Sequence, residues 1–140
     1  MQEIALDAQV AASPEAVWQV YTDSAGWPRW AGVKEVVLRQ AGDPPPDGLG
    51  SIRVIRSRGI AVEEEVTAFA PPRHVAYRMV AGLPVRDFCG EVCFEPADGG
   101  TRIRWTVRFR PWVPGTGPLL RRFVGRMLGD VLERLTSQEY

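Results

Sequence analysis

The chain has 140 residues, of which 45% are hydrophobic and 24% charged, the composition of one ordinary globular domain. Seventeen basic residues balance 17 acidic ones, and this zero net charge disfavours nucleic-acid binding, which depends on a basic excess. No run approaches the roughly 18 apolar residues of a membrane span, and the acids within residues 1–10 are atypical of a signal peptide. We therefore expect a cytoplasmic protein with no membrane span and a single domain over residues 1–140.

The first part of the chain predicts a strand followed by two short helices. Residues 2–11 mix apolar and polar positions as a strand does. Ser13 is a good helix N-cap, Pro14 suits the first helical position, and Glu15 places an acid where the helix dipole favours one. A second short helix is expected to end near Trp30.

The middle of the chain predicts antiparallel strands separated by turns and loops. Residues 43–48 form a loop by composition, and Gly-containing turns are expected at 58–59, 82–84 and 98–100. The strands expected around them cover residues 36–38, 51–57, 60–69, 74–80, 86–95 and 101–110.

The last segment predicts one long helix from Pro118 to Ser137. Its apolar residues recur in adjacent pairs every four positions, which makes one broad stripe along a helix. We expect the side with Leu120, Phe123 and Met127 to face the sheet. Packing this stripe on the apolar face of the sheet gives an α+β domain, and a strongly twisted sheet around a helix often leaves a gap between them.

Several short motifs, taken in this order, resemble a known superfamily. They are Ser13-Pro14-Glu15-Ala16-Val17-Trp18, Trp27-Pro28-Arg29-Trp30, Phe69-Ala70-Pro71-Pro72-Arg73, Gly82-Leu83-Pro84-Val85-Arg86-Asp87, and Gly99-Gly100-Thr101 before Trp105. With the element order, they resemble the SRPBCC (START/birch-pollen-allergen-like) superfamily, in particular its polyketide cyclase/dehydrase-like branch. The resemblance implies a helix-grip fold: a curved antiparallel sheet of six to seven strands wrapped around a long C-terminal helix, with two short helices after the first strand.

The resemblance also implies that the chain binds or transports a hydrophobic small molecule, aromatic, polyketide-like or lipid-like, in an internal cavity. The superfamily contains enzymes and chaperone-associated domains too, and a fold does not determine a reaction. Two alternatives therefore stay open, a polyketide cyclase/dehydratase-type enzyme and a protein-interaction module. The ligand, any reaction and the oligomeric state are left open by the sequence.

Three consecutive acids, Glu63 to Glu65, point to a polar group inside the sheet. Successive side chains of a strand alternate between faces, and Glu64 is in phase with Val62 and Val66. A two-residue turn at 58–59 would place Arg53 opposite Glu64. An inward Arg53–Glu64 pair would orient the polar end of a ligand, whereas the alternative is a solvated ion pair at the rim of the sheet.

Aromatic and methionine side chains from separate segments are candidates for the walls of the cavity. They are Trp30, Tyr77, Met79, Phe88, Trp105, Phe109, Phe123 and Met127. Each of them could equally be plain core filling. We expect the entrance near residues 27–30 and 82–85.

Metal, cofactor and catalytic sites are not predicted. Cys89 and Cys93 would lie about 13 Å apart along a strand, beyond disulfide reach, and with the one histidine, His74, they make a poor metal set. No nucleophile–base set or phosphate-binding glycine loop occurs, so catalytic residues are unknown.

Overall fold

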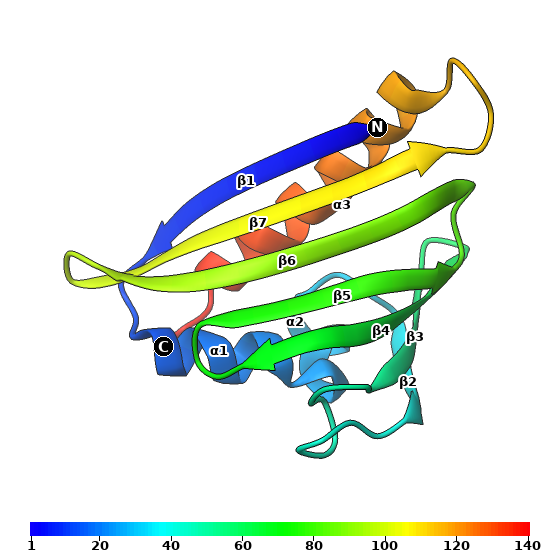
Figure 1. The fold of residues 1–140 in the computed structure, drawn as a ribbon. Helices are drawn as coiled ribbons and strands as arrows, with labels where there is room; N and C mark the ends of the chain where they lie inside the picture. The colour runs from blue at the N-terminus through cyan, green and yellow to red at the C-terminus, as the bar shows by residue number, and fades with distance from the viewer.

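The computed structural model describes all residues from 1 to 140, and Figure 1 shows one curved antiparallel sheet with the helices on its inner face. The elements in chain order are β1 (Gln2–Val10), α1 (Pro14–Thr22), the 3-10 turn η1 (Ser24–Gly26), α2 (Trp27–Trp30), β2 (Glu35–Gln40), β3 (Ile52–Ser57), β4 (Ile60–Ala70), β5 (His74–Ala81), β6 (Val85–Ala97), β7 (Gly100–Pro111) and α3 (Gly117–Thr136).

The seven strands are ordered β1-β7-β6-β5-β4-β3-β2. The chain therefore leaves β1 at one edge, crosses the inner face as α1 and α2, and begins β2 at the other edge (Figure 1). The remaining strands follow as a meander, and α3 returns along the inner face beside β1. This is the helix-grip, α+β arrangement that the sequence predicted. None of the helices has the length and apolarity needed to cross a lipid bilayer.

Local sequence signals explain why the elements begin and turn where they do. The Ser13 hydroxyl accepts a hydrogen bond from the backbone N–H of Ala16 at 3.2 Å, and Pro14 opens α1 as predicted. Arg58 and Gly59 have φ angles of 49° and 77°, the two positive values that a tight hairpin turn requires. This turn fixes the register of β3 against β4.

The packing of α3 differs from the prediction in one respect. The helix has the expected length, but its buried residues are Val124, Leu128, Leu132 and Leu135, with Leu120 and Met127 only half-buried. Phe123, expected to face the sheet, is 41% exposed. Because α3 packs mainly on the edge strand β1, only one flank of its broad apolar stripe is covered. The stripe alone does not determine which flank that is.

Two groups of buried apolar residues make up the core. The larger lies under β5, β6 and β7 and includes the fully buried Phe94 and Phe109. The smaller consists of Trp27, Ala31 and Ile55 beneath the β2–β3 edge. Trp30 packs against both groups, so it joins them.

Candidate ligand-binding site

A buried ion cluster lies on the inner face of the sheet where the two core groups meet. Arg53 on β3 is directly opposite Glu64 on β4, as the turn at 58–59 predicted. The Nε and Nη2 atoms of Arg53 both lie 3.0 Å from Oε1 of Glu64, and its Nη1 atom donates to Asp47 at 3.4 Å. Arg53, Glu64 and Asp47 are only 2%, 8% and 8% exposed, so the alternative of a solvated pair at the rim is wrong.

Neighbouring residues hold this cluster in place from the helical side. The guanidinium of Arg53 lies 4.5 Å from the centre of the Trp27 ring, close enough for a cation–π interaction. The indole N–H of Trp27 donates to the backbone oxygen of Tyr21 at 2.8 Å. Ser24 donates to the Asp47 carboxylate through both its hydroxyl and its backbone N–H. The cluster therefore carries one positive and two negative charges, and protein groups alone hold them in orientation.

Two tyrosine hydroxyls lie next to the cluster. The ring of Tyr21 on α1 contacts Trp105 edge-on with 5.6 Å between centres, and the indole N–H of Trp105 donates to the Tyr77 hydroxyl at 3.0 Å. Burial, with the nearby charge of Glu64, raises the pKa of both tyrosines well above the ordinary value of 10.0. Both hydroxyls therefore stay protonated at neutral pH. Neither donates a hydrogen bond within the protein, so both O–H groups lack an acceptor.

A glycine on the next strand makes room for Tyr77. Gly90 pairs directly with Tyr77, and a Cβ atom at Gly90 would lie 2.5 Å from the phenol oxygen. Any side chain at position 90 would displace the ring. The missing side chain of Gly90 thus lets the Tyr77 phenol lie flat over β6.

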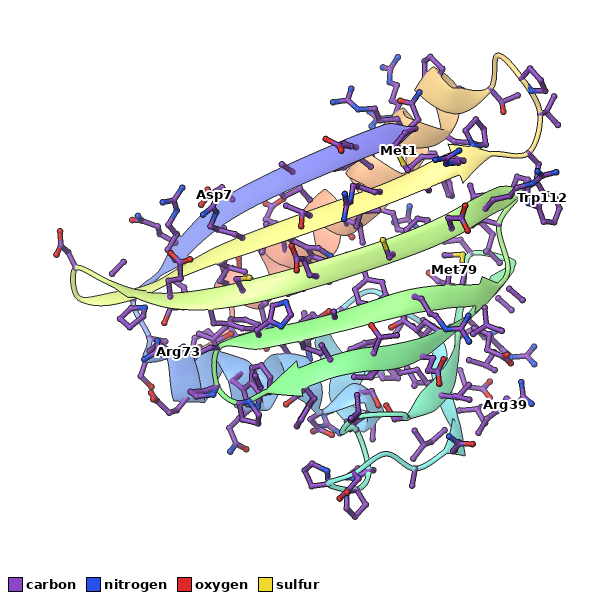
Figure 2. The ribbon with its side chains drawn as sticks, viewed as in Figure 1. Met1, Asp7, Arg39, Arg73, Met79 and Trp112 are labelled. Carbon is purple, nitrogen blue, oxygen red and sulfur yellow. The ribbon has the colours of Figure 1, made fainter.

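An apolar pocket of about 190 Å³ opens beside this polar group, at the end of the sheet where β5 turns into β6. Its lining is made of Met79, Val80, Ala81, Gly82, Leu83, Val85, Phe88 and Trp112. Met79 is the cross-strand neighbour of Glu64, so the pocket and the ion cluster are adjacent along the inner surface. Figure 2 labels Met79 and Trp112 at this end of the molecule.

The predicted site residues fall into three groups in the structure. Met79 and Phe88 line the pocket, and Arg53, Glu64, Tyr77 and Trp105 form the polar group and its support. Phe109 is completely buried, with its ring stacked 5.6 Å from Phe88, and Trp30 joins the two core groups. Phe123 and Met127 lie on the flank of α3 that the sheet does not cover. The entrance expected at residues 82–85 coincides with the pocket, whereas residues 27–30 are not among its walls.

Sequence reasoning missed three members of the polar group. Tyr21, on the apolar face of the first short helix, is not among the predicted site residues, and Trp27 is expected only at the entrance, within residues 27–30. Asp47 falls in the loop that composition predicts over residues 43–48, and its carboxylate is buried against Arg53. A buried arginine with one carboxylate partner suggests that a second carboxylate lies nearby, and this reasoning is the signal that points to Asp47.

Comparison with known proteins agrees with the architecture. The family model described as polyketide cyclase/dehydrase and lipid transport matches residues 1–138. The chain belongs to this family. A hydrophobic small molecule is the kind of ligand that this description implies.

Individual relatives have the same fold, but none of their descriptions names a ligand. An uncharacterised protein of Mycobacterium tuberculosis is 32% identical, with 94% of this chain and 82% of that protein covered. The structure of XoxI from Bacillus cereus matches with a TM-score of 0.81 at 19% identity, covering 97% of this chain and 94% of that one. A START superfamily protein from Mycobacterium smegmatis matches with a TM-score of 0.79 at 15% identity, covering 96% and 94%.

Proposed function

We propose that the protein binds a hydrophobic small molecule carrying at least one oxygen function, with its apolar part in the pocket beside Met79 and its polar end at Glu64 and the two tyrosines. One observation carries this proposal: an ion cluster of one arginine and two carboxylates, next to two tyrosine hydroxyls that lack an acceptor, is buried beside an apolar pocket. Ligand sites combine these elements, mostly apolar walls with a few converging polar groups. Membership of the family supports the same class of ligand.

In this proposal each polar group has a different role. Tyr21 and Tyr77 keep their protons, so they donate to a carbonyl or hydroxyl oxygen of the ligand. The Nε and Nη2 atoms of Arg53 converge on Oε1 of Glu64, while its Nη1 atom donates to Asp47, which leaves Oε2 of Glu64 to accept a hydrogen bond from a ligand hydroxyl. In this proposal Arg53 acts by orienting Glu64.

The pocket must widen when the ligand enters. Its volume of about 190 Å³ is below the roughly 300 Å³ at which drug-sized ligand pockets begin. Two of its walls can move at low cost, since Met79 has a flexible side chain and Trp112 is 57% exposed. The ligand therefore enters at the β5–β6 end and displaces these two side chains.

Filling the pocket tests the proposal. Ala81→Phe places a ring in the pocket, and Ala5→Phe places the same ring on the outer face of β1 as a control. An environment-sensitive apolar dye should bind wild type and Ala5→Phe alike and bind Ala81→Phe at least tenfold more weakly. Native mass spectrometry of the purified wild-type protein should show a co-purified apolar molecule that Ala81→Phe lacks. Equal dye binding by all three proteins would remove the pocket from the function.

Glu64→Gln separates a carrier from an enzyme. The change keeps the shape of the side chain and removes its charge, so a carrier should lose about the value of one charge-assisted hydrogen bond, roughly 1.5–3 kcal/mol of binding free energy. A substrate whose turnover collapses in Glu64→Gln while its binding persists would replace the carrier by the cyclase/dehydratase-type enzyme.

A further inference from the structure

The connection from β7 to α3 exposes an unusual amount of apolar surface. Trp112, Val113, Leu119 and Phe123 are 57%, 57%, 71% and 41% exposed. Figure 1 shows that this connection and the first turns of α3 lie at the end of the sheet that also carries the β5–β6 turn. We name these four residues the apolar rim. Exposed apolar side chains grouped in this way typically mark an interaction surface, because water is excluded when a partner covers them.

The charge around the apolar rim has one sign. No Asp or Glu occurs between Asp98 and Asp130, while seven arginines do, although the whole chain is neutral. Five exposed arginines border the rim: Arg86, Arg110, Arg121, Arg122 and Arg126. The acids close to this end are Glu3, Asp87 and Glu63, which lies opposite Ala81 and is paired with Arg39, so the end keeps a net positive charge.

These five arginines have no role in holding the fold together through ion pairs. Several arginines elsewhere on the surface are paired, such as Arg39 with Glu63, Arg78 with Glu65 and Arg102 with Asp7, whereas others, such as Arg73 and Arg108, are not. None of the five at the rim has an acidic partner within 4.0 Å. Arg86 and Arg110 even lie directly opposite each other across β6 and β7, where like charges repel.

The first turns of α3 combine exposed apolar side chains with positive charge. Leu119 and Phe123 are four residues apart and therefore share one face of the helix, and Arg122 and Arg126 flank it at the same spacing. A hydrogen bond from the backbone N–H of Trp112 to the backbone oxygen of Pro84, at 3.1 Å, connects the β7–α3 loop to the β5–β6 turn. The apolar rim is thus fixed beside the entrance of the pocket.

From this charge complementarity we propose that the apolar rim docks the protein on the surface of a membrane containing anionic lipids. Trp112 and Leu119 enter the interfacial layer, and the arginines bind the phosphate groups around them. Docking places the β5–β6 entrance against the bilayer. The apolar rim shares Trp112 with the wall of the pocket, but the proposal does not depend on which ligand the pocket holds.

Vesicle flotation tests the proposal with defined lipids. The wild-type protein should float with phosphatidylcholine vesicles that contain phosphatidylglycerol and not with phosphatidylcholine vesicles alone, and added salt should release it. Arg122→Gln should weaken binding about fivefold, and Leu119→Ser about tenfold. Matched controls are Arg73→Gln, an exposed arginine at the opposite end of the sheet (Figure 2), and Leu49→Ser, whose leucine is 51% exposed in the β2–β3 loop. Both should bind vesicles as wild type does.

Three outcomes would overturn the proposal: no flotation of the wild-type protein, equal flotation with neutral vesicles, or equal losses in the rim and control variants. A wild-type dimer in solution that Leu119→Ser converts to a monomer would instead make the rim an interface between two copies. Binding of the apolar dye is measured in every variant. Dye binding that persists while flotation is lost shows that the pocket is intact and that only the docking surface is affected.

Discussion

Removing the charge of Glu64 should destabilise the protein measurably, because that charge is buried. In Glu64→Gln the amide oxygen can still accept from Arg53, and Asp47 remains 3.4 Å from the guanidinium, so Arg53 keeps one ionic partner. The loss is then that of one charge-assisted hydrogen bond, about 2 kcal/mol of the free energy of unfolding. For a domain of this size, this loss of free energy of unfolding corresponds to a decrease of roughly 5–10 °C in Tm.

Glu63→Gln is the matched control on the adjacent position of β4. Glu63 pairs with Arg39, whose side chain is 57% exposed, and a pair of this kind contributes at most about 1 kcal/mol. Arg53→Met should lower the free energy of unfolding by more than either glutamate substitution, about 3–5 kcal/mol, since it leaves Glu64 and Asp47 as buried carboxylates without a cation. Urea denaturation followed by circular dichroism measures all three. Equal stability of Glu64→Gln and Glu63→Gln would refute the reasoning that burial makes the pair matter.

Three further predictions test the packing around the site. Val124→Asp should prevent folding, because Val124 is fully buried, whereas Phe123→Asp should leave the circular dichroism spectrum and Tm nearly unchanged. Gly90→Ala should lower the free energy of unfolding by about 1–3 kcal/mol in urea denaturation, since the new methyl group collides with the Tyr77 ring. The raised pKa values of Tyr21 and Tyr77 give stability that is fully present below pH 10 and is lost as the pH rises above 10. Phenolate absorbance of Tyr21 and Tyr77 should therefore appear together with unfolding, and absorbance beyond that of the one exposed tyrosine, Tyr140, in the folded protein would contradict the burial of these hydroxyls.

The sequence predicts the fold well where short-range signals act alone. The Ser13 cap, the turn at 58–59 and the strand alternation of β4 each depend on a few neighbouring residues, and together they fix the register that places Arg53 opposite Glu64. Alternation in β4 also identifies Glu64 as the inward member of its acidic run, and it is the buried one.

The parts that the sequence does not predict depend on tertiary packing. The apolar stripe of α3 is broad enough for either flank to face the sheet, and the position of β1 decides that Val124 is covered and Phe123 exposed. Asp47 reaches Arg53 only because its loop folds under β3, which no local pattern signals. The volume and lining of the pocket likewise depend on side-chain packing rather than on periodicity.

The position of the ion cluster is better explained by binding than by stability. Replacing a buried ion cluster by apolar side chains of similar volume often leaves a protein equally stable or more stable, so folding alone does not favour Arg53, Glu64 and Asp47 inside this core. The cluster lies next to an apolar pocket, and the absence of a side chain at Gly90 leaves room for the Tyr77 phenol beside the cluster. Both features place hydrogen-bonding groups in the core next to the pocket wall at Met79. Stability alone would favour aliphatic side chains at these positions, whereas the oxygen-bearing apolar ligand that we propose calls for polar ones.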